Sequence, residues 1–112
     1  MDTRGRPKKY RLVKHDPKIS HFSPRGRPGR PDEVDLTMDE FEAIRLIDFM
    51  GFSQKEASRS MRISQQTFSR VLKKARKALA DGLVMGKIIK IHGGHYVISS
   101  RDVNSPKKLN SA

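Results

Sequence analysis

The chain has 112 residues, with 24 Lys and Arg against 12 Asp and Glu, and its formal net charge is +12. This length has room for one small domain with tails, and so basic a balance is typical of proteins that bind DNA, RNA or an anionic membrane surface. The absence of cysteine excludes disulfides and thiolate metal sites. No apolar run reaches the roughly eighteen residues that span a bilayer, so we expect a cytoplasmic protein with no membrane partner.

Residues 1–31 form a basic arm rich in Pro, Gly and Arg, most of which we expect to be extended or loosely ordered. Arg-Gly-Arg-Pro occurs twice, at 4–7 and 25–28. It is the core of an AT-hook, whose extended backbone lies in the minor groove of A·T-rich DNA. The alternative is a flexible arm that binds phosphate without sequence preference. The side chains assigned to a minor groove or to phosphate are Arg4, Arg6, Lys8, Lys9, Arg25 and Arg27. Two apolar patches, 10–13 and 19–22, are candidates for docking on the domain.

Residues 32–50 are acidic and include the first predicted helix, at about 38–50. Thr37 and Glu40 match the capping box, in which each side chain bonds a free backbone N–H of the other residue. The helix is apolar on much of its circumference, which indicates a central position, and Gly51 is placed to end it. The acidic side chains favour a face that is solvated, or paired with the chain's own arginines, over a docking surface for RNA polymerase.

Two further helices are predicted at about 54–61 and 65–85, with Gly86 as the stop. Ser53 and Glu56 form a second capping box, and Ser64 caps the longer helix. Two helices separated by so short a turn have the spacing of a helix-turn-helix, whose second helix enters a DNA major groove. Arg62 lies in the turn, where such motifs usually place Gly for a left-handed backbone.

The start of the longer helix supplies the candidate DNA contacts, because side chains of its first two turns reach base edges. Gln pairs well with adenine, Arg with guanine, and Lys with phosphate. The predicted base contacts are Ser64, Gln65, Gln66, Ser69 and Arg70. The predicted backbone contacts are Arg62, Thr67, Lys73, Lys74 and Lys77. The alternative is a helical hairpin in a small bundle with a solvated basic face.

Residues 87–91 and 96–98 are β-branched runs on either side of His92-Gly-Gly-His95, a pattern typical of a β-hairpin. The two histidines are too few for a structural zinc site, which takes four ligands. We find no phosphate loop, no nucleophile elbow and no cysteine, so we expect neither an enzyme nor a cofactor. The expected fold is mainly α, with a helix-turn-helix domain and C-terminal hairpin at 32–98, the arm at 1–31 and a disordered tail at 99–112.

The chain resembles a family of small prokaryotic proteins known as domain of unknown function 134, over about residues 4–96. The matching stretches include Leu-Thr-Met-Asp-Glu-Phe-Glu-Ala-Ile-Arg-Leu-Ile-Asp at 36–48, Gly-Phe-Ser-Gln at 51–54 and Ser-Gln-Gln-Thr-Phe at 64–68, with shorter matches at 6–9, 22–24, 86–87 and 93–94. Family members look like relatives of the fourth region of bacterial sigma factors. The resemblance therefore implies a helical DNA reader.

We accordingly expect a nucleoid-associated protein that binds double-stranded DNA and regulates transcription. The rival hypothesis is an adaptor that docks on RNA polymerase through its acidic helix. RNA binding is less favoured because few aromatic residues are available to stack on bases. A homodimer is a further expectation, since one small reader rarely gives enough specificity, although no heptad repeat supports it.

Overall fold

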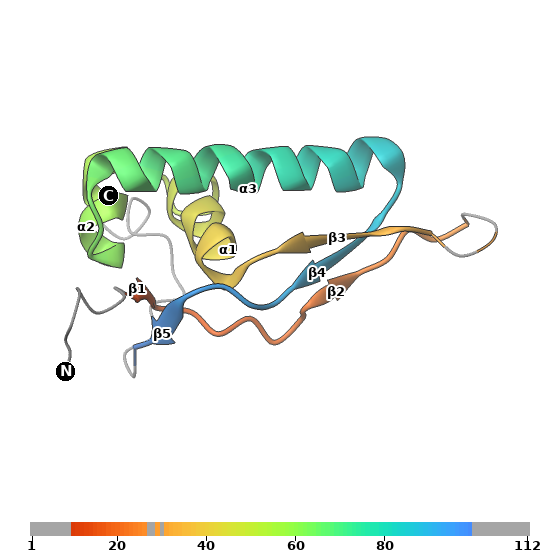
Figure 1. Ribbon diagram of the computed structural model, residues 1–112, viewed down its shortest axis with the longest axis horizontal. Helices are drawn as coiled ribbons and strands as arrows, with labels where there is room; N and C mark the ends of the chain where they lie inside the picture. Colours follow the sequence, from red (N-terminus) through yellow and green to blue (C-terminus); the bar gives the residue numbers. More distant parts are fainter. Residues whose placement is uncertain (1–9, 27–28, 30, 100–112) are drawn as a thin grey trace, which may run out of the picture.

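A computed structural model of the chain describes residues 10–26, 29 and 31–99 (Figure 1). Its helical elements are α1 (Met38–Ile44), the π-helical segment η1 (Arg45–Phe49), α2 (Gln54–Met61) and α3 (Gln65–Met85). Its strands are β1 (Arg11–Val13), β2 (His21–Phe22), β3 (Glu33–Leu36), β4 (Ile88–Ile91) and β5 (Tyr96–Ile98). Figure 1 shows α3 running along one side of the molecule, with α1 and α2 near its first half and β2, β3 and β4 near its second half.

The three predicted helix starts are confirmed, with the capping side chains in place. Thr37 N donates to Glu40 Oε1 at 3.0 Å, and Ser53 N donates to Glu56 Oε1 at 2.9 Å. Ser64 Oγ accepts from Thr67 N at 3.0 Å. These contacts satisfy backbone groups that a helix start leaves free. The predicted bounds of α2 and α3 are also confirmed, and Gly86 ends α3 in the left-handed conformation.

The first helix differs from the prediction in its second half, where α1 widens into η1. Met50 N donates to Arg45 O at 2.8 Å, a bond across five residues instead of four. Phe52 N donates to Leu46 O at 2.8 Å and closes the end of the segment. A π-helical turn shifts the side chains that follow it around the axis. The widening therefore changes the direction of the side chains that follow it, before α2 begins.

The turn between α2 and α3 spans residues 62–64 and depends on an unusual backbone at Arg62. Its φ of 58° and ψ of 45° place it in the left-handed region. No other residue with a side chain has a positive φ in the described part of the chain. Glycine adopts this conformation without steric cost, whereas a side chain makes it strained. The sequence position predicted for a left-handed residue is thus confirmed, although Arg occupies it.

The core consists of two adjoining clusters, and α3 contributes to both. The first packs α1, η1, α2 and α3, and contains Ala43, Leu46, Ala57, Met61, Phe68, Val71 and Leu72. The second packs α1, α3 and the strands, and contains Val13, Leu36, Met38, Ala75, Ile89 and Ile91. At Gly82 the helix approaches β4 so closely that an added Cβ would lie 2.5 Å from Ile89 Cγ1. This packing fixes the rotation of α3 about its axis.

The expectation of a mainly α fold with a C-terminal hairpin is wrong. The described residues contain five strands in two small sheets, and the two segments predicted to pair belong to different sheets. β4 lies between β2, to which it is antiparallel, and β3, to which it is parallel. β5 pairs in parallel with β1. Both edges of β4 are therefore occupied, and β5 has no place beside it.

The connection from β4 to β5 shows why no hairpin forms. His92 N donates to Leu36 O at 3.1 Å, and Met38 N donates to Gly93 O at 3.0 Å. The backbone between the two strands thus bonds to the end of β3 and the start of α1. Gly93 and Gly94, at φ values of 80° and 92°, turn the chain toward β1. Their positive φ serves this change of direction and not a tight hairpin turn.

The N-terminal segment is described only in part, and its two strands lie in the apolar patches that were expected to dock on the domain. β1 and β2 come from this segment, and Val13 is fully buried. Both apolar patches named as candidates for docking contribute to strands of the sheets. Residues 1–9 and 100–112, assigned to the arm and to the tail, lie outside the described residues. Among the helices that are described, none has the length and apolar character needed to cross a membrane.

Candidate nucleic-acid interface

The solvent-facing side of α3 is the candidate interface. Phe68, Leu72 and Ala75, spaced three to four residues apart along α3, form an apolar stripe buried in the core. Burial of this stripe turns the other side of the helix to solvent. The polar residues exposed on that side are Gln65, Gln66, Ser69, Arg70, Lys73, Lys74 and Lys77. The fold thus presents the predicted amide and cationic side chains together on one helix surface.

The residues at the start of α3 divide into hydroxyls that are engaged and side chains that are free to bind. Ser64 Oγ donates to Thr67 Oγ1 at 3.0 Å and accepts from its backbone N–H. Both hydroxyls are thus engaged in the cap of α3. Arg62, Arg70 and Lys74 form no ion pair with another described residue, and neither do Lys73 and Lys77. These cations lie open to an external anion.

Arg76 is the exception among the α3 cations. Its guanidinium bonds the Asp48 carboxylate of η1, with Nη2 to Oδ1 at 2.8 Å and Nε to Oδ2 at 3.3 Å. This hydrogen bond, with the charge of Asp48 beside it, raises the pKa of Arg76 above its ordinary value, while slight burial acts the other way. Arg76 therefore links α3 to η1, and it was not among the predicted DNA contacts.

The acidic block of residues 32–50 is largely paired within the chain. Arg45 bonds Glu42, Arg11 lies 3.5 Å from Asp39, and Arg76 bonds Asp48. In the sheet, Lys90 lies 3.3 Å from Glu33, and His92 Nε2 lies 2.9 Å from Asp35 Oδ1. These contacts support the structural interpretation of the acidic residues over a free docking surface.

Most of the predicted arm contacts cannot be placed. Arg4, Arg6, Lys8, Lys9 and Arg27 lie outside the described residues, and only Arg25 is described, with an exposed side chain. The structure instead brings an unpredicted residue of the same segment to α3. Arg11 lines a groove with Thr67, Arg70 and Lys74, beside His95. No local sequence pattern indicates this neighbourhood, because it depends on the pairing of β1 with β5.

Comparison with known proteins places the chain in a single family. A family model described as "Protein of unknown function DUF134" matches residues 1–99. The chain belongs to this family. A "UPF0251 protein" of Desulfosudis oleivorans is 49% identical over 98 residues, which cover 87% of this chain and 71% of that protein. "UPF0251 protein Teth39_0655" of Thermoanaerobacter pseudethanolicus is 45% identical over 98 residues, covering 87% and 83%. A "UPF0251 protein" of Methanococcus vannielii is 45% identical over 96 residues, covering 85% and 74%.

The DUF134 membership confirms the resemblance inferred from the sequence motifs. The descriptions of the family and of these relatives name no activity, so they do not test the DNA-binding hypothesis. No solved structure matches the chain.

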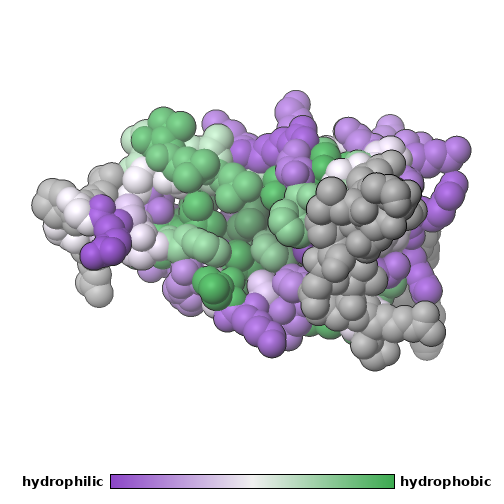
Figure 2. Space-filling view, turned by 180° about the vertical axis from the view of Figure 1, so that it is seen from behind, coloured by the Kyte–Doolittle hydropathy of each residue, from purple (hydrophilic) through white to green (hydrophobic). Residues whose placement is uncertain are grey.

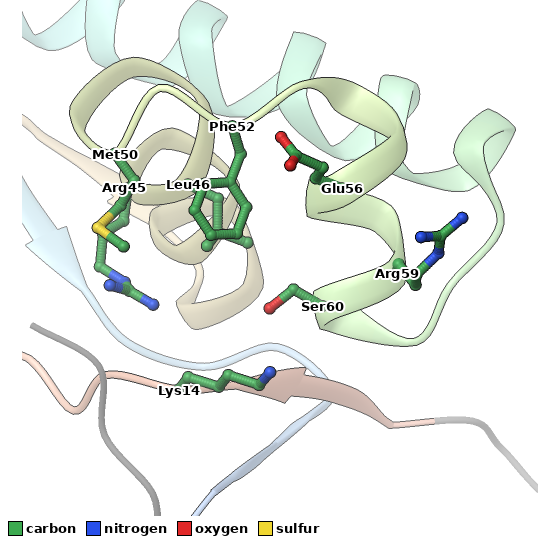
Figure 3. Close-up of a pocket in the computed structure, with 8 residues that line it drawn as sticks. All are labelled: Lys14, Arg45, Leu46, Met50, Phe52, Glu56, Arg59 and Ser60. Atoms are coloured by element: carbon green, nitrogen blue, oxygen red, sulfur yellow. The ribbon is translucent and has the colours of Figure 1, made fainter. Parts of the chain in front are cut away.

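A second concavity of the DUF134 chain lies between α2, η1 and the residue after β1 (Figure 3). It has a volume of about 390 Å³, and Leu46 and Phe52 form an apolar floor. Figure 3 shows Ser60 facing this floor from α2, Lys14 crossing below it, and Arg59 extending away from it. Glu56, at its rim, already accepts the Ser53 N–H of the helix cap. The carboxylate at this rim is thus already part of the α2 cap.

Apolar side chains also remain exposed on the surface, one of them in strand β2. Ile19, Phe22 and Phe49 are each more than half exposed. A concavity of about 450 Å³ lies between Phe49, Phe41 and neighbouring side chains, and His15 stacks on Phe41 with the ring centroids 6.0 Å apart. Figure 2 shows an apolar area between polar margins on the face seen from behind. The expected homodimer stays a prediction, because no described contact tests it.

The two histidines at the glycine turn have separate neighbours. His92 bonds Asp35, whereas the ring of His95 lies 5.9 Å from that of Tyr10. Within the described residues, no group of three or more His, Cys, Asp and Glu is arranged to hold a metal ion. The histidines therefore contribute to the two sheets in different places.

Proposed function

We propose that this DUF134 protein binds double-stranded DNA through α3 and acts as a nucleoid-associated transcriptional regulator. The observation that carries the proposal is the free side of α3, which presents amides and unpaired cations while its other side is locked in the core. A helix of 21 residues is about 30 Å long, and the major groove is about 12 Å wide and admits one helix.

The proposed docking follows from the arrangement of α2 and α3. α2 precedes α3 by a turn of residues 62–64, which is the order of a first helix and a recognition helix. Gln66, two residues from the cap, is placed to bond adenine in the major groove, and Arg70 one turn later is placed to bond guanine. Lys73 and Lys77 follow along the same side, where they would meet phosphates. The start of α3 carries no acidic residue that would repel DNA.

The test is binding of the full chain to random-sequence duplex DNA, measured by fluorescence anisotropy over a series of salt concentrations. We expect tight binding at low salt that weakens steeply as salt rises, because bound cations release counterions from the phosphates. Selection from a random library is expected to enrich one motif. Binding without an enriched motif would contradict base reading, and no binding at low salt would contradict the whole proposal.

The adaptor alternative has less support. An acidic docking surface needs carboxylates that are free to meet a partner, and Glu42, Asp39 and Asp48 are engaged with arginines of this chain. We assign the protein no catalytic step and no cofactor. Recovery of RNA polymerase with the protein after nuclease treatment would favour the adaptor over the DNA reader.

A further inference from the structure

We propose that the groove between α3, β1 and the β4–β5 connection seats one phosphate of the DNA backbone, and that Arg11 is its principal ligand. This inference rests on the proposed DNA binding and adds a contact outside the predicted reading helix. The groove has a volume of about 320 Å³, and Arg11, Arg70, Lys74 and His95 contribute its basic side chains. It lies against the start of α3, beside the helix side proposed to enter the major groove.

Strand pairing holds Arg11 in this position. β1 runs parallel to β5, with Arg11 opposite Tyr96, and Arg11 N donates to His95 O at 3.2 Å. Gly94 brings this backbone close to α1, since an added Cβ would lie 2.7 Å from Asp39 Oδ1 and 3.0 Å from Thr37 Cβ. A side chain at this position would push the connection away from α1. The groove is therefore built by tertiary contacts and not by one flexible side chain.

The acidic residues in the groove are already engaged. Asp39 lies 3.5 Å from Arg11 Nη1 and accepts the Thr37 hydroxyl at 2.5 Å. Glu40 accepts the Thr37 N–H at 3.0 Å as part of the helix cap. Asp39 thus has its charge paired with Arg11, and one Glu40 oxygen is held by the helix cap. Asp39 also holds one end of the Arg11 guanidinium, which orients the remaining donors.

Arg11 has more hydrogen-bond donors than the neighbouring residues supply acceptors. Its Nε is buried and has no hydrogen-bond partner among the described residues. Because Nε has no accessible surface, an anion in the groove would bond the terminal Nη groups of Arg11, whose side chain is 26% exposed. Lys74, from α3, supplies a second cation without an ion pair to another described residue. A phosphodiester fits this chemistry, because arginine bonds two phosphate oxygens with its fork of N–H groups.

The groove also gives the DNA a second point of contact. Gln66 and Lys77 are exposed on α3, whereas Arg11 comes from β1 and lines the groove together with Arg70. Contacts from two elements to neighbouring phosphates fix the register of a recognition helix on the duplex. Arg70 borders both the groove and the base-reading positions. Replacing Arg70 would therefore not separate a phosphate contact in the groove from a base contact.

The experiment compares duplex binding of the unmodified chain, Arg11→Gln, Arg11→Lys and Lys18→Gln over a series of salt concentrations. Lys18 is exposed, lies in the same N-terminal segment and does not line the groove, so its loss controls for charge alone. We expect Arg11→Gln to reduce the slope of log K against log salt by about 0.9, the value for one phosphate. Lys18→Gln is expected to retain the full slope, and Arg11→Lys to retain most of it.

Thermal unfolding of each variant separates lost binding from lost structure, since Arg11 also contacts Asp39. A folded Arg11→Gln variant with the slope of the unmodified chain would overturn the phosphate seat and leave the DNA proposal standing. An equal reduction in Lys18→Gln would overturn it as well, because the effect would then be one of net charge. Failure of the unmodified chain to bind duplex DNA would overturn both proposals.

Discussion

The Arg45 guanidinium holds the Glu42 carboxylate with two hydrogen bonds, from Nε to Oε1 at 2.8 Å and from Nη2 to Oε2 at 2.9 Å. Glu42 is fully buried and Arg45 nearly so. Lys14 N also donates to Glu42 Oε2, at 3.0 Å, and connects the segment after β1 to α1. The pair lies where α1 passes into η1, so it joins the N-terminal strand, the helix and the π-helical turn.

Replacing Glu42 by Ala is expected to lower the free energy of unfolding by about 3–5 kcal/mol, because Arg45 would remain buried without its partner. The measurement is urea denaturation followed by circular dichroism. Glu33→Ala is the matched control, since Glu33 pairs with Lys90 but is about half exposed. That change should cost no more than about 1 kcal/mol. Equal losses in the two variants would contradict a special role of the buried pair.

Replacing Arg62 by Gly is expected to raise the free energy of unfolding by about 1 kcal/mol, because Gly removes the strain of a left-handed side-chain residue. The φ of Arg62 is 58°. Arg62→Lys keeps both the charge and the strain, and it should leave stability unchanged. Chemical denaturation of the three proteins checks this. A Gly variant less stable than the original would mean that the Arg62 side chain stabilises the turn by contacts that outweigh the strain.

Replacing Gly82 by Ala is expected to destabilise the protein by about 1–3 kcal/mol, the usual cost of overpacking a core. The added Cβ would meet Ile89 Cγ1 at 2.5 Å and Val34 Cγ1 at 3.2 Å. Helix propensity alone favours Ala over Gly by about 1 kcal/mol, so the two effects have opposite signs. The double variant with Ile89→Val removes one clashing methyl and should recover part of the loss. A stabilised Gly82→Ala variant would contradict this, because it would show that the sheet can shift away from α3 at little cost.

Replacing Gln66 by Ala is expected to relax sequence preference at one base pair, with a loss of about 1–3 kcal/mol on the preferred site only. Lys77→Gln is the comparison, because loss of a phosphate contact should weaken binding to all sequences alike. Anisotropy titrations with the selected site and a scrambled site measure both. Equal losses on the two sites for Gln66→Ala would remove it from the base-reading set.

The helices of this protein follow from local sequence. Each start depends on a capping side chain and a backbone group at most three residues away, as for Ser53 and Glu56. The apolar stripe of α3 likewise repeats within single turns, so its buried and exposed sides follow from spacing alone. The exposure of Gln66 and Arg70 was predictable for this reason, and so was membership of the family from the motifs along the chain.

Only the tertiary structure decided how the strands pair and what lies beside α3. Two β-branched runs around Gly93 and Gly94 predict a hairpin, yet β4 bonds β2 and β3 from distant parts of the chain. Strand pairing depends on which edges the whole fold leaves open, and that information is not local. The same reason placed Arg11 beside α3 and buried Glu42 between Arg45 and Lys14, where the acidic pattern alone left open a solvated face, pairing with the chain's own arginines or a docking surface.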